Sequence, residues 1–137
     1  ENLAAIAGMV AALKESLNCY QENMEHVESL KQQLLSELDG IHYYINNDSH
    51  ILPYVVNLGF LNQANDLLLM RLDLAGISIS TGSACTAGAI EPSHVLKAFY
   101  GSDSERLRES IRISFSEQNT SEEVRQFTTT LKEILGG

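Results

Sequence analysis

A run of small residues between positions 80 and 89 contains the side chain best suited to chemistry. The run reads Ser-Thr-Gly-Ser-Ala-Cys-Thr-Ala-Gly-Ala, and none of its side chains is larger than Thr or Cys. Because such side chains cannot anchor a core, we expect a mobile loop in which Gly82 and Gly88 give backbone freedom on either side of Cys85. A thiol on such a loop can attack as a thiolate and move away still carrying a product. The composition therefore favours a reactive Cys85 over the small buried hydrophobe that a free cysteine usually is.

Arg112 is the second candidate, and it lies in the segment from Ser110 to Ser116. Apolar and polar residues alternate there, with the period of two that is typical of a half-buried strand. A guanidinium meets a carboxylate through two parallel charge-assisted hydrogen bonds, which a lysine cannot reproduce. From the residues alone, a carboxylate-binding Arg112 and an outward-facing strand residue paired with an acid are equally supported.

The remaining polar side chains give weaker signals. The two cysteines are 66 positions apart and no paired histidines occur, so we expect no metal site. His94 follows Glu-Pro-Ser at the start of a predicted helix and is expected on the surface of that helix. Cys19 lies in the irregular stretch Asn18-Cys19-Tyr20 between two helical patterns, where it is expected to pack in a helix or to be a partly exposed thiol.

Composition narrows the class of protein that can position these residues. The chain has 137 residues, 44% hydrophobic and 20% charged, which suits one globular domain over 1–137. Nine basic against 18 acidic residues give a net charge of -9, so the attraction to phosphates that drives nucleic-acid binding is missing. No apolar run approaches the roughly 18 residues of a membrane span, and the N-terminus lacks the pattern of a signal peptide. We therefore expect a cytoplasmic protein with no nucleic acid and no membrane as partner.

The pattern along the chain predicts an α+β domain of order ααββαβαβα, with a small sheet packed against helices. Apolar residues at steps of three and four predict two long helices, or one with a break near Asn18, before a left-handed cap at Gly40. A capping box of Thr120 and Glu123 begins the last helix. The further elements are expected as strands at 41–45, 54–58, 77–80 and 110–116, and as helices at 63–75, from Glu91-Pro92-Ser93 to Tyr100, and at 121–135.

One long string resembles a known family. Residues 76 to 96 read Gly-Ile-Ser-Ile-Ser-Thr-Gly-Ser-Ala-Cys-Thr-Ala-Gly-Ala-Ile-Glu-Pro-Ser-His-Val-Leu. This string resembles the catalytic-loop segment of cysteine desulfurases of the iron-sulfur and nitrogen-fixation type, in the class V aminotransferase group. The segments Val-Val-Asn-Leu at 55–58 and Ser-Ile-Arg-Ile-Ser-Phe at 110–115 resemble two strands of the same family. The resemblance implies the small C-terminal domain of a PLP-dependent transferase of fold type I. The chain opens on Glu1 within helical periodicity, so we expect a fragment of a longer enzyme.

The resemblance also implies an activity. The family uses pyridoxal 5'-phosphate (PLP) to convert L-cysteine to L-alanine, and its loop cysteine takes up the sulfur as a persulfide. Cys85 matches that nucleophile, and Arg112 matches the arginine that binds the substrate carboxylate. The sulfur would then pass to an acceptor or scaffold protein, for iron-sulfur cluster or thio-cofactor assembly. The full-length enzyme is expected to be a homodimer.

The sequence departs from the family at the cofactor anchor. The family attaches PLP to a Lys that follows a His, and no His-Lys pair occurs in this sequence. We therefore expect the fragment alone to bind no cofactor and to be inactive. The alternatives are a free-standing carrier that receives a persulfide on Cys85 from a partner, and a dimerisation or interaction module.

Overall fold

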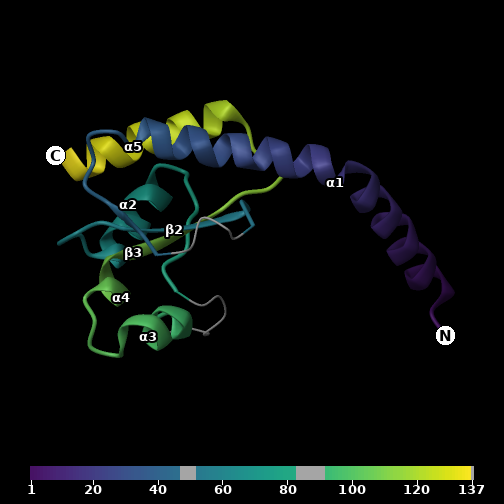
Figure 1. Cartoon of the computed structure of the whole chain (residues 1–137), viewed down its shortest axis with the longest axis horizontal. Coiled ribbons are helices and arrows are strands. Elements are labelled where there is room, and N and C mark those ends of the chain that lie inside the picture. The colour runs from purple at the N-terminus through teal and green to yellow at the C-terminus, as the bar shows by residue number, and fades with distance from the viewer. Residues whose placement is uncertain (47–51, 83–91, 137) are drawn as a thin grey trace.

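The fold is built around a small antiparallel sheet that has one apolar face and one polar face. The computed structural model describes residues 1–46, 52–82 and 92–136. The sheet has the strand order β1-β2-β3, with β1 at Tyr44–Ile45, β2 at Val55–Gly59 and β3 at Ser110–Ser114. Helices α1 and α5 cover one face, and α3 lies on the other side (Figure 1). The expected α+β class and the small sheet packed against helices are therefore confirmed.

The apolar face of the sheet forms the core. Strand alternation places Val56 and Leu58 of β2 beside Ile111 and Ile113 of β3, and all four are buried. Three helices pack on this face, namely α1 (Leu3–Glu37), α2 (Asn65–Leu74) and α5 (Ser121–Gly136). They contribute Leu30, Leu34, Leu68, Leu72, Val124, Phe127 and Leu131. Because Ile111 and Ile113 of β3 face this core, the polar residues of β3 lie on the opposite face of the sheet.

The first helical region is one continuous helix of 35 residues, so neither the two expected helices nor the expected break is present. Asn18, Cys19 and Tyr20 interrupt only the apolar spacing, because none of them lacks a backbone N–H or requires positive φ. Asn2 caps the start by accepting a hydrogen bond from the N–H of Ala5 (3.1 Å). Past the end of the helix, Gly40 has φ +85°, as expected of a left-handed cap.

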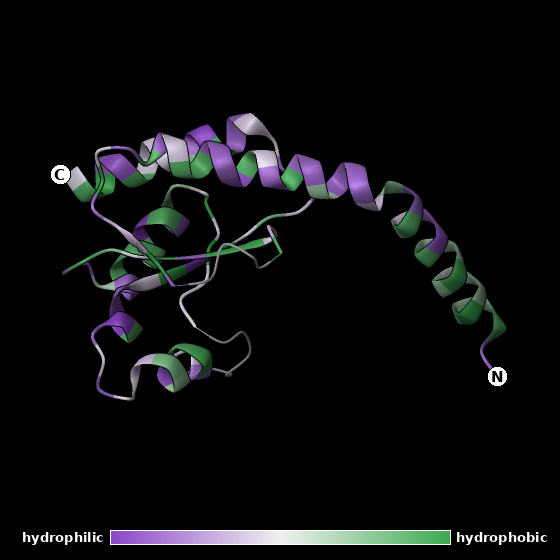
Figure 2. Cartoon of the chain, viewed as in Figure 1, coloured by the Kyte–Doolittle hydropathy of each residue, from purple (hydrophilic) through white to green (hydrophobic). Residues whose placement is uncertain are grey.

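The two halves of α1 have different surroundings. Its C-terminal half packs against α5, whereas its N-terminal half projects beyond the body of the domain (Figure 1). Colouring by hydropathy shows apolar positions along the projecting turns (Figure 2). The exposed apolar side chains of this half are Leu3, Ile6, Met9, Val10, Leu13, Leu17 and Tyr20.

Two expectations about short elements are wrong. Residues 77–80 do not form a strand, because Ile77 and Ile79 pack against the core and only Ser80 pairs with β3. A groove separates 76–79 from β3 and α5. The helix expected from Glu91 begins only at His94, since Ser93 accepts a hydrogen bond from the N–H of Leu96 (3.4 Å) and is the N-cap.

These differences change the element order to αββαααβα over the described residues. The expected helix that ends at Tyr100 is α3 (His94–Tyr100), and the added helix is the short α4 (Arg106–Glu109), which was not expected. Composition offered no signal for α4, because one helical turn leaves no measurable periodicity. The capping box of α5 is confirmed: the N–H of Thr120 donates to Glu123 (2.7 Å), and the N–H of Glu123 donates to the Thr120 hydroxyl (3.3 Å).

Candidate functional site

The second face of the sheet carries a row of polar residues that runs across the strands. Asn46 follows β1, and its N–H donates to the carbonyl of Asn57 on β2 (2.9 Å). Asn57 lies directly opposite Arg112 of β3, and Arg112 pairs in turn with Ser80. The Arg112 N–H donates to the Ser80 carbonyl (2.6 Å), and the Ser80 N–H donates back (3.1 Å). We call Asn46, Asn57, Arg112 and Ser80 the polar row.

The guanidinium of Arg112 is half-buried and only partly hydrogen-bonded. Its Nη2 donates to the hydroxyl of Ser80 (3.1 Å). Its Nε is buried and has no hydrogen-bond partner among the described residues. Nε and a neighbouring Nη form one edge of the guanidinium, and such an edge can bind a carboxylate with two parallel bonds. The arrangement therefore suits a carboxylate ligand.

Arg112 has no acidic partner within the part of the chain that the structure describes. The ion pairs found there join Lys31 to Glu28 (3.9 Å) and Arg125 to Glu122 (2.9 Å). The alternative of an outward-facing arginine paired with an acid thus finds no support in the described residues. A half-buried cation without a counter-charge is costly unless a ligand supplies one.

A second arginine near the sheet, Arg106, contacts aromatic rings, whereas Arg112 is bonded to Ser80. The Arg106 guanidinium carbon lies 4.3 Å from the ring centre of Tyr44 and 4.6 Å from that of Tyr100. The Tyr44 hydroxyl donates to Glu109 (3.3 Å), and burial is the main cause that raises the pKa of Tyr44. Arg106 is thus packed between two rings, while the Nε of Arg112 has no hydrogen-bond partner in the described part of the chain.

Cys85 lies outside the described residues, as does the whole of 83–91, so the expected mobile loop and the reactive thiol stay predictions. The residues on both sides of that segment are described. Ser80 is bonded to Arg112, and Gly82 pairs with Pro92 in an antiparallel bridge. The chain therefore enters and leaves the segment beside the polar row.

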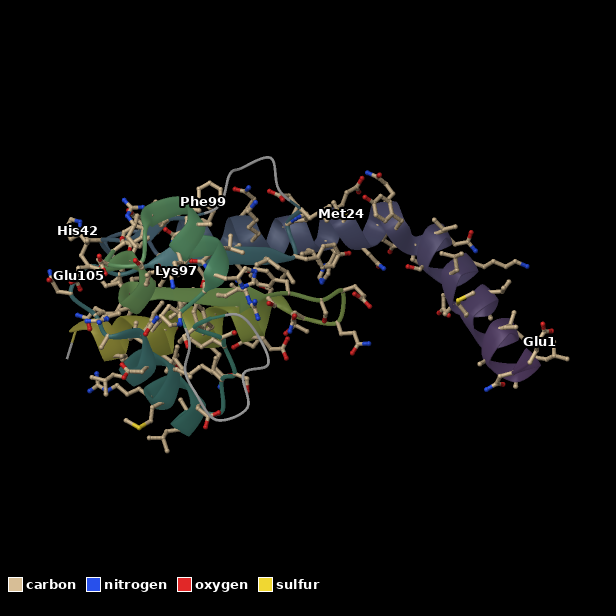
Figure 3. The ribbon with its side chains drawn as sticks, turned by 90° about the horizontal axis from the view of Figure 1, so that it is seen from below. Glu1, Met24, His42, Lys97, Phe99 and Glu105 are labelled. Carbon is tan, nitrogen blue, oxygen red and sulfur yellow. The ribbon has the colours of Figure 1, made fainter. Side chains whose placement is uncertain are left out.

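The lysines of the chain do not match a cofactor anchor. Lys14, Lys97 and Lys132 are exposed on α1, α3 and α5, and Figure 3 shows Lys97 on α3 together with Phe99. Lys31 is buried on α1 beside Glu28. None of the four has a hydrogen bond to the polar row among the described residues. PLP, which the family implies, therefore does not fit a lysine of this chain.

The other sequence candidates have ordinary surroundings. His94 is exposed at the start of α3, as expected for a residue on the helix surface. Cys19 is a half-buried free thiol on α1. Within residues 1–46, 52–82 and 92–136, no group of three or more His, Cys, Asp or Glu is placed to hold a metal ion. No helix in the same ranges is long and apolar enough to cross a membrane.

Sequence reasoning identified Arg112 but missed its neighbours in the polar row. Asn46, Asn57 and Ser80 are unremarkable as single residues. Asn57 was within reach of the alternation rule, since it separates Val56 from Leu58 and so faces away from the core. Its position opposite Arg112 depends on strand register, which no local pattern in the chain gives.

Comparisons with known proteins place the chain in a family. The model of the aminotransferase class-V family matches residues 1–127. The chain belongs to this family.

Individual relatives that match this chain include IscS and NifS-like proteins of that family. An IscS 1 protein of Bacillus subtilis is 44% identical over 128 residues, which cover 91% of this chain and 34% of the relative. A cysteine desulfurase IscS of Neisseria meningitidis serogroup A is 33% identical over 133 residues, which cover 96% of this chain and 32% of the relative. The solved NifS-like protein of Rickettsia africae has a TM-score of 0.82 at 29% identity, and the match covers all of this chain and 36% of that one. The chain thus spans about a third of the length of the relatives it matches, and the resemblance to cysteine desulfurases extends over nearly all of it.

Proposed function

We propose that the chain is the C-terminal domain of a PLP-dependent cysteine desulfurase, and that Arg112 binds the α-carboxylate of L-cysteine there. The observation that carries the proposal is the buried Nε of Arg112, which has neither a hydrogen-bond partner nor an acid within ion-pair distance among the described residues. Ser80 holds the Nη2 atom, so one edge of the guanidinium is oriented before a ligand arrives. A carboxylate would satisfy both the hydrogen-bonding capacity and the charge.

In this proposal Cys85 accepts the sulfur. Its thiolate attacks the sulfur of L-cysteine, an S–S bond forms, and the carbon–sulfur bond of the substrate breaks. The electron pair stays on the carbon, which takes up a proton, so the products are L-alanine and a persulfide on Cys85. Atoms and electrons balance without an external oxidant. Cys85 is three residues from Gly82, so covalent geometry limits the distance between their Cα atoms to about 11 Å.

Further parts of the proposal concern the complete protein. PLP would supply the electron sink for the chemistry and would be held by residues outside this chain. The persulfide sulfur would pass to an acceptor or scaffold protein for iron-sulfur cluster or thio-cofactor assembly. The complete enzyme would be a cytoplasmic homodimer. The exposed apolar side chains on the projecting half of α1 support a domain that packs against further protein.

A chimaera tests the proposal. The matching third of the Bacillus subtilis IscS 1 protein is replaced by this chain, and L-alanine and sulfide formation from L-cysteine are measured, with the unaltered host as positive control. We expect the chimaera to turn over. Cys85→Ala should abolish persulfide formation while leaving the PLP absorbance unchanged, and Cys19→Ala is the matched control that should keep full activity.

The chain by itself completes the test. With PLP and L-cysteine it should show no internal-aldimine absorbance and should release no sulfide above a boiled control. Turnover by the chain alone would contradict the assignment as one domain of a larger enzyme. An inactive chimaera, together with a persulfide that the host transfers to Cys85 of the separate chain, would instead favour the free-standing carrier.

A further inference from the structure

Asn46 holds together two side chains that flank Arg112 on the polar face of the sheet. Its Nδ2 donates to Oδ1 of Asn57 (2.8 Å) and to the hydroxyl of Ser110 (2.9 Å). Asn57 lies directly across from Arg112, and Ser110 precedes Arg112 by two residues on the same face of β3. The Ser110 hydroxyl donates in turn to the carbonyl of Arg106 (2.6 Å). Both neighbours of Arg112 are therefore fixed through one asparagine.

The register brings the stem of Arg112 close to Asn57. Directly opposite residues in an antiparallel pair have Cβ atoms about 4.5 to 5.5 Å apart. Ser80 holds Nη2 from the other side of β3. Arg112 thus lies between Ser80, which bonds its guanidinium, and Asn57, which is directly opposite on β2. A side chain held in this way keeps one orientation, which is what two-pronged recognition of a carboxylate requires.

We propose that Asn57, fixed by Asn46, is a positioning residue that sets the orientation of the Arg112 guanidinium. The consequence for substrate binding rests on the proposed function, while the positioning itself does not. Neither asparagine is a catalytic residue here, because both act through Arg112.

A purely structural role explains this network poorly. The Oδ1 atom of Asn46 is buried without a hydrogen-bond partner among the described residues. A buried polar group left unpaired is destabilising, and replacing such a partly satisfied network by apolar residues of similar shape is often neutral or stabilising. Stability alone therefore does not explain two asparagines at this place in the fold.

The test uses the Nε–Hε signal of Arg112 in the 15N-labelled 137-residue chain, assigned by its loss in Arg112→Lys. Hydrogen exchange at Hε is measured well below the melting temperature. The double variant Asn46→Leu with Asn57→Leu removes the network but keeps its shape. We expect Hε exchange to accelerate on the order of 10-fold or more, with the melting temperature nearly unchanged. Ser114→Ala, on the same face and strand but outside the polar row, is the matched control and should leave the exchange rate unchanged.

The single variant Asn46→Ala provides the same test if the double variant does not fold, since it removes only the hydrogen bonds that Asn46 donates to Asn57 and Ser110. Exchange at Arg112 that stays at the wild-type rate in a folded variant would overturn the proposal.

Kinetics in the chimaera separate positioning from carboxylate binding. Asn57→Leu should raise KM for L-cysteine about 10-fold and leave kcat nearly unchanged, as expected for lost substrate binding. Faster Hε exchange with unaltered KM would keep the positioning role and remove the carboxylate role of Arg112. An unchanged exchange rate would remove the positioning role whatever the kinetics.

Discussion

The two faces of the sheet are built from the same strands, but one face is packed in the core and the other carries the polar row. On one face Val56, Leu58, Ile111 and Ile113 are buried beneath three helices. On the other face Asn57 and Arg112 occupy the alternate positions and are half-buried, in the company of Asn46 and Ser80. The apolar face shows complete burial, whereas two buried atoms of the polar row, Asn46 Oδ1 and Arg112 Nε, have no hydrogen-bond partner among the residues that the structure describes.

We expect the core-facing residues of β3 to contribute to stability and its residue in the polar row, Arg112, to contribute to ligand binding. Residues that alternate along β3 should divide into those whose replacement unfolds the domain and those whose replacement changes ligand binding. The division is sharp because the side-chain period of a strand is two, so neighbours on the chain never share a face. Substitutions on the two faces therefore provide direct tests of the account.

The largest effect is expected on the apolar face. Ile111→Ala should lower the free energy of unfolding by about 2 to 5 kcal/mol, because Ile111 is fully buried and its truncation leaves a cavity. Urea denaturation followed by circular dichroism measures the change. Ser114→Ala on the same strand should shift the free energy by less than about 0.5 kcal/mol, since Ser114 is exposed. Equal effects at the two positions would contradict the assignment of the faces.

A smaller effect is expected where α5 begins above the apolar face. Thr120→Ala removes the hydroxyl that accepts a hydrogen bond from the N–H of Glu123. Loss of such a cap should lower the free energy of unfolding by about 1 kcal/mol. Thr120→Ser retains the acceptor and should restore nearly all of the stability. A serine variant as unstable as the alanine variant would show that the methyl group, and not the cap, stabilises α5.

A carboxylate that joins α1 to α5 gives a dependence on pH. The Thr128 hydroxyl and then the Gln33 amide donate to Glu37, and these hydrogen bonds lower the pKa of Glu37 below its ordinary value of 4.5. A lowered pKa in the folded state stabilises the fold above pH 4.5, and this contribution is lost as the pH falls through the folded pKa. Glu37→Gln should therefore lower the free energy of unfolding by about 1 kcal/mol at most at pH 7, because the site is near the surface.

The same difference should vanish at acidic pH. Below the folded pKa both Glu37 and its glutamine replacement are neutral, so the wild type and the variant should converge when unfolding is measured at decreasing pH. Thr128→Val is the control, since it removes the main donor and should also remove most of the pH dependence. A difference that persists unchanged in acid would show that Glu37 acts through packing and not through its charge.

The smallest effect is expected on the projecting half of α1. Leu13 is 56% exposed, and Leu13→Ala should change the free energy of unfolding of this chain by less than about 0.5 kcal/mol. In the chimaera the same substitution should be more destabilising if further protein covers this helix face, as proposed. Equal, small effects in both proteins would remove that support for the domain assignment.

Local patterns in the sequence predicted most of the elements. Alternation placed the strand around Arg112, and the capping box placed the start of α5 next to the residue where the structure begins it. The strand expected at 77–80 is wrong because of contacts between distant parts of the chain. Residues 77–80 have strand composition, yet Ile77 and Ile79 pack against the core instead of pairing with β3, and only tertiary contacts decide between the two.

At the site, too, local sequence patterns did not predict contacts between residues that are far apart in the chain. Arg112 stood out because its chemistry is specific and its segment resembles a known family. The partners Asn57 and Ser80 could not be predicted, because they are 55 and 32 residues away in sequence and are joined to Arg112 only by strand register and an edge contact. The role of Cys85 was predicted from composition and resemblance, and it stays a prediction.

The central claim is that Arg112 recognises a carboxylate, and substrate discrimination in the chimaera tests it most directly. The measurement compares kcat/KM for L-cysteine with that for cysteamine, which lacks the carboxylate, in the Arg112 and Arg112→Lys proteins. Lysine keeps the charge but loses the two-pronged geometry, so kcat/KM for L-cysteine should fall on the order of 10- to 100-fold, while that for cysteamine should hardly change. The preference for L-cysteine should shrink by the same factor, with the fold intact by circular dichroism. An undiminished preference for L-cysteine in the folded lysine variant would contradict the assigned role of Arg112.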